Sequence, residues 1–222
     1  MKKALAKKYI HDNAIKNVSG IKYFKSITGL NLSGNELVEI TDSLSTRLIA
    51  LNLSNNLLYQ LPDLAPGINS LNCSYNLPLS QLTRLPDSLQ DFDCSFCSIV
   101  MLPALPSHIK YLNVRFNKIT SLPEPLPDSL QTLNSSGNLI STLPIKWPSK
   151  IFHFDCSLNR ILSLNTKFPE SLKGLNCSEN QISNIFLQVP EGLEYLNLSE
   201  NKISSLPDKL PEKLKTLDCS HN

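Results

Sequence analysis

From residue 27 onward, apolar residues recur in one pattern every 20 or 21 residues. Each repeat opens with Leu or Ile, which we number position 1. Leu or Phe follows at position 4, a small or branched residue at position 6, and usually Asn at position 9. The first repeat runs through Ile27, Leu30, Leu32 and Asn35. A fixed period in this range is typical of a solenoid in which each repeat contributes one strand.

Positions 4 and 6 alternate with polar residues at positions 5 and 7, which predicts a short strand with one buried face. The side chain at position 9 turns inward and can bond backbone groups that would otherwise be buried without a partner. Cys97 stands at position 9 once, where a thiol can partly replace the amide. The other members of this column are Asn35, Asn56, Asn76, Asn117, Asn138, Asn159, Asn180, Asn201 and Asn222.

The second half of a repeat usually carries a Leu-Pro pair, and eight repeats carry a further proline. Proline forbids a regular helix, so we expect an extended, polyproline-like return path with short turns. The stretch Leu77–Leu85 (LPLSQLTRL) lacks the usual register, and we expect a local irregularity there. The further prolines are Pro66, Pro86, Pro106, Pro127, Pro148, Pro169, Pro190 and Pro211.

The repeat LxxLxCSxNxIxxLPxxLPxS resembles the leucine-rich repeat in its short bacterial form. That form is similar to the repeats of secreted effectors of Gram-negative pathogens, some of which carry a ubiquitin-ligase domain after the repeats. The resemblance implies an α/β-class solenoid dominated by β structure, a horseshoe whose concave side is a parallel sheet of about ten strands. The segment Val18–Leu30 also resembles the entry segment of bacterial surface leucine-rich-repeat proteins.

Two segments are expected along the chain: a basic capping segment at residues 1–26 and a solenoid of ten repeats at residues 27–222. Residues 1–25 hold seven lysines against one acid, and we expect a short basic helix over about residues 2–12. No apolar stretch follows the first lysines, so a secretory signal is not predicted. The last repeat is incomplete, and we expect Leu214, Leu217 and Cys219 to face an end without a cap, which a partner or further chain would cover.

The composition narrows the classes of partner. Of 222 residues, 41% are hydrophobic and 18% are charged, which supports a buried core. The net charge of +2 is too small to make nucleic acid the main partner. No apolar run reaches the roughly 18 residues that span a bilayer, and membrane contact is not expected.

Five of the six cysteines stand at position 6 and are interpreted as small buried hydrophobes. Neighbouring pairs such as Cys73 with Cys94, or Cys156 with Cys177, would lie about 4.8 Å apart, so a disulfide is sterically conceivable, although a reduced core is simpler. Cys94 and Cys97 form a lone CxxC without a second ligand pair, and no metal or cofactor is predicted. Unpaired thiols favour a reducing compartment.

No catalytic signature was found, and we predict that these residues do not form an enzyme. The four histidines lie in different columns of the repeat, and no nucleophile or phosphate-binding motif accompanies them.

The concave face carries its information in the variable positions 3 and 8, because positions 5 and 7 are nearly uniform. Tyr75, Phe96 and Phe116 stand at position 8 of consecutive repeats and are expected to stack into one aromatic ridge. Tyr, Phe and Arg commonly anchor protein interfaces. The candidate partner-binding residues are Tyr75, Asp91, Phe96, Tyr111, Arg115, Phe116, Phe152, His153, Leu158 and Tyr195.

These observations predict a non-catalytic module that binds a protein on its concave face, in a bacterial effector-like or intracellular scaffold protein. It would act in the cytoplasm or after secretion into a host cell. One alternative is the substrate-recognition part of a ubiquitin ligase whose catalytic domain lies outside this chain. Another is a cell-surface adhesion or receptor ectodomain.

Overall fold

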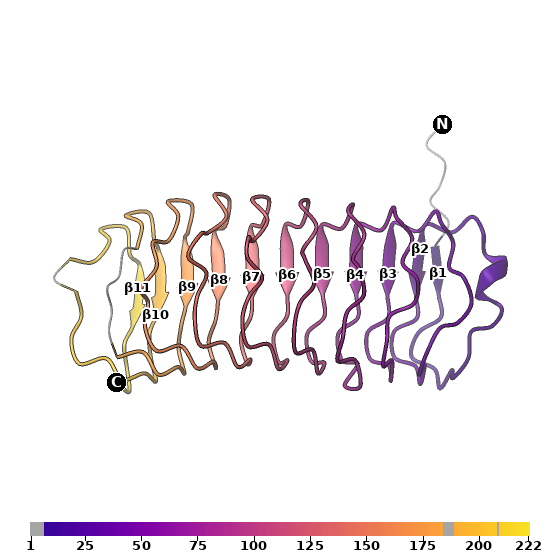
Figure 1. The fold of residues 1–222 in the computed structure, drawn as a ribbon, viewed down its shortest axis with the longest axis horizontal. Coiled ribbons are helices and arrows are strands. Elements are labelled where there is room, and N and C mark those ends of the chain that lie inside the picture. The colour runs from indigo at the N-terminus through magenta and orange to yellow at the C-terminus, as the bar shows by residue number, and fades with distance from the viewer. Residues whose placement is uncertain (1–6, 184–188, 208) are drawn as a thin grey trace. The chain divides into compact units, whose positions relative to one another are not determined.

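The computed structural model describes residues 7–183, 189–207 and 209–222, and the chain divides into two units, residues 1–109 and 110–222. In both units, successive turns of chain each contribute one three-residue strand (Figure 1). The first unit contains β1 (Lys7–Tyr9), the 3-10 helix η1 (Ile21–Tyr23), β2 (Gly29–Asn31), β3 (Ala50–Asn52), β4 (Ser70–Asn72) and β5 (Asp91–Asp93). The second contains β6 (Tyr111–Asn113), β7 (Thr132–Asn134), β8 (His153–Asp155), β9 (Gly174–Asn176), β10 (Tyr195–Asn197) and β11 (Thr216–Asp218).

Within each unit, every strand pairs in parallel with the next strand along the chain, position for position. Leu30 lies beside Leu51 in the first unit, and Leu133 lies beside Phe154 in the second. Because the register never slips, each position of the repeat becomes a column that crosses the sheet at about 4.8 Å per strand. The solenoid of parallel strands predicted from the repeat is confirmed, with eleven strands in the described residues.

The columns at positions 1, 4, 6 and 11 form the core. In the second repeat these are Leu48, Leu51, Leu53 and Leu58, each at most 2% exposed. Burial of one such side chain contributes about 1.5–3 kcal/mol. A single turn buries only a few of them, so the turns stabilise one another by stacking.

The position-9 asparagines bond the backbone of adjacent turns, as predicted, and we call this column the asparagine ladder. Asn159 is typical of it. Its Nδ2 donates to the carbonyls of Ser135 (3.0 Å), Cys156 (3.1 Å) and Ser157 (3.0 Å). Its Oδ1 accepts from the Ile140 N–H at 2.9 Å. One buried side chain thus bonds its own turn and the preceding one.

Cys97 occupies the same place with weaker bonds. Its thiol donates to the carbonyls of Cys73 and Ser95, both at 3.5 Å from sulfur. The expected partial replacement of the amide is confirmed, since a thiol is a weak donor and a weak acceptor.

The uniform column at position 5 has a structural cause. Asn72 Oδ1 accepts from the Ser74 N–H (2.9 Å) and hydroxyl (2.7 Å), and Asp93 Oδ1 makes the same two bonds with Ser95 (2.9 and 2.7 Å). These bonds close the turn after each strand. They need only an acceptor oxygen, so Asn and Asp serve equally well.

Position 8 adopts the left-handed backbone conformation, which the sequence pattern did not reveal. Gly34 and Gly137 have φ of 65° there, and Tyr75, Phe96 and Phe116 have φ between 52° and 55°. For a residue with a side chain this conformation costs roughly 1–2 kcal/mol. The neighbouring ladder bonds therefore hold these residues against their backbone preference.

The helix predicted over residues 2–12 is wrong for the described part, residues 7–12; residues 2–6 lie outside the described residues. Lys7–Tyr9 forms β1, in which Lys8 pairs with Leu30. Lys8 thus takes the place that leucine holds elsewhere, and this hides the repeat in the sequence. Its ammonium lies 5.3 Å from the centre of the Phe24 ring. Among the described residues β1 is the first strand of the sheet, and a charged side chain suits such an edge because a strand covers it on one side alone.

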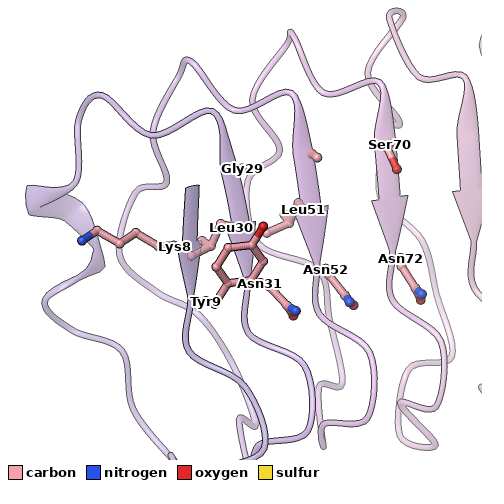
Figure 2. Close-up of a pocket in the computed structure, with 10 residues that line it drawn as sticks. Lys8, Tyr9, Gly29, Leu30, Asn31, Leu51, Asn52, Ser70 and Asn72 are labelled. Atoms are coloured by element: carbon pink, nitrogen blue, oxygen red, sulfur yellow. The ribbon is translucent and has the colours of Figure 1, made fainter. Parts of the chain in front are cut away.

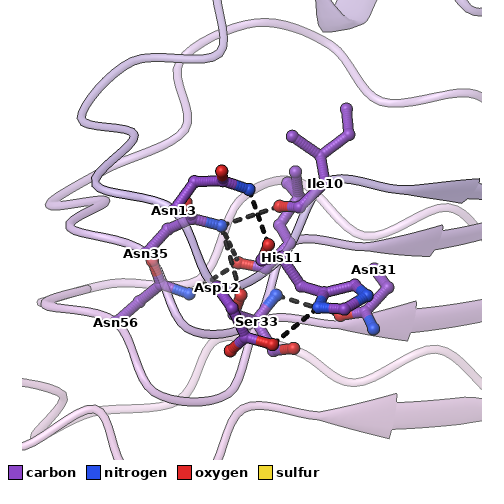
Figure 3. Close-up of polar contacts among 9 residues, drawn as sticks. Ile10, His11, Asp12, Asn13, Asn31, Ser33, Asn35 and Asn56 are labelled. Atoms are coloured by element: carbon purple, nitrogen blue, oxygen red, sulfur yellow. Dashed lines mark hydrogen bonds and ion pairs between the residues drawn. The ribbon is translucent and has the colours of Figure 1, made fainter.

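The turn after β1 continues the repeat. Asp12 has φ of 55°, as at position 8. Asn35 Nδ2 donates to the Ile10 carbonyl at 2.7 Å (Figure 3). Asn35 Oδ1 accepts from the Ile15 N–H at 3.2 Å. Residues 7–15 therefore form one turn of the solenoid ahead of the first repeat visible in the sequence.

The return segments contain turns and bends and, in the described residues, no α-helix, as the prolines predicted. The irregularity expected within Leu77–Leu85 is confirmed. Leu79 is fully buried, and its carbonyl accepts from the Ser98 N–H at 2.8 Å, as the Leu37 carbonyl does from Leu57 at 2.9 Å. Leu79 follows Asn76 by three residues, whereas the corresponding Leu37 and Leu58 follow Asn35 and Asn56 by two.

Near residue 222 the core columns become accessible. Leu217 is 38% exposed, whereas Leu196, its partner in β10, is fully buried. Leu214 and Cys219 are half-buried. The expected exposure of these three side chains is confirmed.

Candidate partner-binding surface

We call the solvent side of each unit's strands, where the side chains of positions 3 and 5 lie, its open face. On the open face of the second unit, Tyr111, Thr132, His153, Gly174 and Tyr195 line a hollow of 310 Å³. We call it the Tyr–His hollow. Because all five stand at position 3, consecutive strands β6 to β10 each supply one of them.

The tyrosines and the histidine form its walls, and Gly174 leaves room for the histidine. Tyr111 and Tyr195 are 39% and 40% exposed. A Cβ on Gly174 would lie 2.5 Å from His153 Nδ1, so the imidazole covers this glycine. The sequence indicated Tyr111, His153 and Tyr195 as candidates, and the structure brings these three together around one hollow.

Two further features border the Tyr–His hollow. The Phe152 ring lies edge-on to His153, with centroids 4.9 Å apart and planes at 64°. Glu194, which precedes Tyr195, accepts a hydrogen bond from Lys215 Nζ at 2.7 Å. This ammonium lowers the pKa of the Glu194 carboxyl.

Of the predicted aromatic ridge, one contact is confirmed. The rings of Tyr75 and Phe96 stack with centroids 4.3 Å apart and planes at 10°. Phe116 belongs to the second unit, where its ring covers Gly137: a Cβ there would lie 2.6 Å from Phe116 Cδ1. Since these rings stand at position 8, they lie in the turns after the strands.

The remaining candidates occupy separate places. Asp91 is exposed on the open face of the first unit, at the start of β5. Arg115 is half-buried in the turn after β6. Leu158, 40% exposed, lies in the turn after β8, beyond the end of the strand that His153 begins. Of the three neighbouring candidates Phe152, His153 and Leu158, the first two are in contact through their rings, whereas Leu158 lies at the other end of the strand.

Sequence reasoning missed a hollow of 290 Å³ on the open face of the first unit (Figure 2). Gly29, Ala50 and Ser70 form its floor, Tyr9 stands at one side, and Asn31, Asn52 and Asn72 line it. We call it the amide hollow. The run of small residues at position 3 was the available signal, but Tyr9 could be placed only once β1 was known.

A third hollow, of 610 Å³, lies on the return side of the first unit, away from the strands. Its lining includes Leu82, Val100 and Met101, and the last two are 52% and 76% exposed. Part of its lining, residues 80–82, belongs to the irregular stretch Leu77–Leu85.

The cysteines are structural. All six are free thiols. Of the five at position 6, Cys73, Cys94, Cys156 and Cys177 are fully buried, as predicted, and Cys219 is half-buried. Cys156 and Cys177 bring their sulfurs within 3.3 Å across neighbouring strands. Burial raises the pKa of Cys97 to about 11, and it raises the pKa of Cys73 well above its ordinary range. A thiolate is needed for nucleophilic attack, so these buried thiols are poor nucleophiles at neutral pH.

Within residues 7–183, 189–207 and 209–222, no three His, Cys, Asp or Glu side chains converge as metal ligands would. The same residues contain no helix with the length and apolar character needed to cross a membrane.

Comparison with known proteins gives concordant matches. A family model described as Leucine Rich Repeat matches residues 192–212. The structure of YopM from Yersinia enterocolitica WA-314 is similar with a TM-score of 0.84 and 35% identity, over 89% of this chain and 43% of that one. A Shigella effector leucine-rich-repeat domain is similar with a TM-score of 0.62 and 32% identity, over 71% of each chain.

Among curated proteins, fibromodulin from Bos taurus is 28% identical over 120 residues, which is 50% of this chain and 32% of fibromodulin. The chain therefore spans about a third of fibromodulin and less than half of the Yersinia enterocolitica YopM.

Proposed function

The chain belongs to the leucine-rich-repeat family, and we propose that it is a non-catalytic module that binds a protein partner in the Tyr–His hollow. The chain resembles the leucine-rich-repeat domains of bacterial effector proteins. We infer from this likeness a bacterial effector-like or intracellular scaffold role, in the cytoplasm or after secretion into a host cell.

The observation that carries the proposal is the grouping of Tyr111, His153 and Tyr195 around one hollow. Tyrosine offers a large rigid surface and one polar group at low entropic cost, and such side chains dominate the energetics of many interfaces. A hollow between two tyrosines accepts a projecting side chain of the partner. Phe152, stacked edge-on against His153, extends the apolar contact.

The polar groups of the Tyr–His hollow orient the bound partner more than they add to its affinity. Asp155 already accepts two hydrogen bonds from Ser157, at 2.9 and 2.7 Å. Its second carboxylate oxygen remains available to a donor of the partner, because the two Ser157 bonds use Oδ1 alone. Specificity thus comes from the shape of the hollow and a few directed bonds.

The test is partner capture with a photo-crosslinking residue at Thr132, inside the Tyr–His hollow. The intact chain is compared with the triple variant Tyr111→Ala, His153→Ala, Tyr195→Ala. Exposed Tyr59 of the first unit, whose hydroxyl donates to Glu39 at 2.7 Å, supplies the control Tyr59→Ala. We expect one protein to be crosslinked by the intact chain and the control and lost with the triple variant. The proposal is contradicted if the triple variant still crosslinks that protein, or if the intact chain crosslinks no protein.

A further inference from the structure

The amide hollow of the first unit has a chemistry different from that of the Tyr–His hollow. Its floor is made of Gly29, Ala50 and Ser70, so a ligand can approach the backbone of β2, β3 and β4 closely. The Tyr9 side chain projects over one side of this floor, and it is 65% exposed (Figure 2). The hollow is thus shallow, flat and bordered by one aromatic ring.

Three primary amides border the floor in a row. The Oδ1 atoms of Asn31, Asn52 and Asn72 accept from the backbone N–H two residues later, at 3.0, 3.0 and 2.9 Å. A backbone N–H is always a donor, so the oxygen must face it and the orientation of each amide is settled by its bond.

Each of these amides therefore presents its Nδ2 to solvent. In the described residues, no protein acceptor bonds the Nδ2 of Asn31, Asn52 or Asn72. The strands pair residue for residue, so the three NH2 groups repeat at the strand spacing of about 4.8 Å. Figure 2 shows the three side chains side by side and similarly directed.

The charge of the lining residues narrows the chemical class of ligand that the amide hollow can bind. Among the residues that line the hollow, Lys8 alone carries a charge, and its ammonium is held 5.3 Å from the Phe24 ring centre. Figure 2 shows the Lys8 side chain directed away from Tyr9. Neutral NH2 donors suit hydroxyl and ether oxygens, whereas nucleic acid phosphates require several cations.

The spacing of the three NH2 groups narrows the class of ligand further. An extended peptide presents side chains to one face every roughly 6.6 Å, which does not match the strand spacing. Each sugar of an extended β-1,4-linked hexose chain advances by close to one strand spacing and offers oxygen acceptors on both edges. The face of a pyranose ring can also lie against an aromatic ring such as that of Tyr9.

We propose that the amide hollow binds an extended, uncharged β-1,4-linked polysaccharide. The sugar chain crosses β2, β3 and β4 with one sugar on each strand. Asn31, Asn52 and Asn72 donate from Nδ2 to its oxygens, and Tyr9 stacks on a fourth sugar. This site belongs to the first unit and goes beyond the proposed function, so it stands or falls separately from the Tyr–His hollow.

The test is an NMR titration of the full 15N-labelled chain that follows the side-chain NH2 signals of the asparagines. The probes are cellohexaose and chitohexaose, and maltohexaose serves as the control because its α-1,4 linkage curves the chain out of register. We expect saturable shifts at Asn31, Asn52 and Asn72 with at least one β-1,4 hexamer and none with maltohexaose.

The substitution Asn52→Asp removes one donor and keeps the acceptor that closes the turn. The chain itself contains this solution at Asp93, which makes the same bonds with Ser95. We expect Asn52→Asp to weaken hexamer binding about three- to tenfold, the usual effect of one lost hydrogen bond. Tyr9→Ala should weaken it about fivefold. The matched control is Asn197→Asp on β10, which should bind as the unaltered chain does.

Three results overturn the proposal. The first is an absence of shifts at the three amides with both β-1,4 hexamers up to about 10 mM, beyond which binding is negligible. The second is an equal response to maltohexaose, which would make the spacing argument wrong. The third is unchanged hexamer affinity in both Asn52→Asp and Tyr9→Ala. Loss of protein capture in the Tyr–His triple variant bears on none of these outcomes.

Discussion

The open faces of the two units have the same backbone arrangement, and the contrast between them lies in one column of side chains, position 3. At position 3, strands β2 to β4 of the first unit have Gly29, Ala50 and Ser70, which leave a smooth floor, and exposed Asp91 follows on β5. The second unit has Tyr111, His153 and Tyr195 in that column, which raise walls around a hollow. The position-5 column beside them is Asn or Asp in every repeat of both units.

The comparison separates position 5, which the fold constrains, from position 3, which it does not. A position-5 side chain accepts the bonds that close the turn, so its chemistry is constrained wherever the repeat occurs. A position-3 side chain stands over the sheet and has no part in the core or the ladder. It can therefore change from Gly to Tyr without altering the fold, and binding specificity can reside there.

A second contrast lies in the ladder. In the second unit every position 9 is Asn, from Asn117 to Asn222, whereas the first unit has Cys97 once. The Cys97 thiol keeps two long bonds in place of the four that Asn159 makes. The predictions below test these contrasts.

The largest effect is expected for Asn159→Ala. Loss of this side chain leaves buried carbonyls and the Ile140 N–H without their partner, which should lower the free energy of unfolding by about 3–5 kcal/mol. The measurement is urea unfolding followed by circular dichroism. Asn13→Ala is the control, because exposed Asn13 makes one bond to the His11 carbonyl and should cost less than about 0.5 kcal/mol. Equal losses in both variants would refute the ladder as a main source of stability.

The next effect is a loss of stability at high pH. Burial raises the pKa of Cys97 from 9.0 to about 11, so the folded chain keeps a proton that the unfolded chain releases. The contribution of the protonated Cys97 thiol to the free energy of unfolding is fully present below pH 9 and is lost as the pH rises through 11. The loss is about 2–3 kcal/mol, at about 1.4 kcal/mol per pH unit.

The variant Cys97→Asn isolates that contribution. It should unfold with a shallower pH dependence between pH 9 and 11 than the unaltered chain, because one titrating group is gone. It should also be more stable at pH 7 by about 1 kcal/mol, since an amide bonds the ladder better than a thiol. An unchanged slope would show that Cys97 does not titrate differently in the folded state.

A smaller effect is expected for Gly137→Ala. This residue has φ of 65° and lies under the Phe116 ring, so a methyl group is both strained and crowded. The expected loss is about 1–2 kcal/mol by thermal unfolding. Gly67→Ala in the first unit is the control, since its Cβ would meet only the Leu48 carbonyl at 3.5 Å. A loss in Gly67→Ala as large as in Gly137→Ala would contradict this explanation.

The smallest effect is expected at position 3 itself. Tyr195→Ala in the second unit and Ala50→Tyr in the first should each change the free energy of unfolding by less than about 0.5 kcal/mol, because both side chains are exposed. Urea unfolding measures both. A change above about 1 kcal/mol in either variant would mean that position 3 supports the fold, and the separation of fold from binding would be wrong.

Much of this fold was predictable because each column of the repeat has one physical task. Leu51 and Leu53 predicted the buried side of a strand, and Asn56 predicted the ladder. The turn at residues 7–15 was not predictable, since Lys8 stands where leucine marks the strand elsewhere. The charged residue is tolerated only at the edge of the sheet, and a pattern of apolar residues does not show where an edge lies.

The candidate site was predictable in part. Position 3 was recognised as variable, and this identified Tyr111, His153 and Tyr195. Their meeting around one hollow depends on the parallel register of β6 to β10, which places the same position of successive turns side by side. The left-handed backbone at Phe96 and Phe116 was not foreseen, because both residues ordinarily avoid it.

The amino-acid sequence by itself determined the repeat, the strand in each turn, the buried columns and the ladder, since these follow from the period and from side-chain polarity. The tertiary structure alone decided which exposed side chains meet. Stacking sets residues about 20 positions apart at the strand spacing, and it brings Tyr9 to the amides of Asn31 and Asn52 and His153 to Gly174. Proximity between turns is a property of that stacking, and no single repeat contains it.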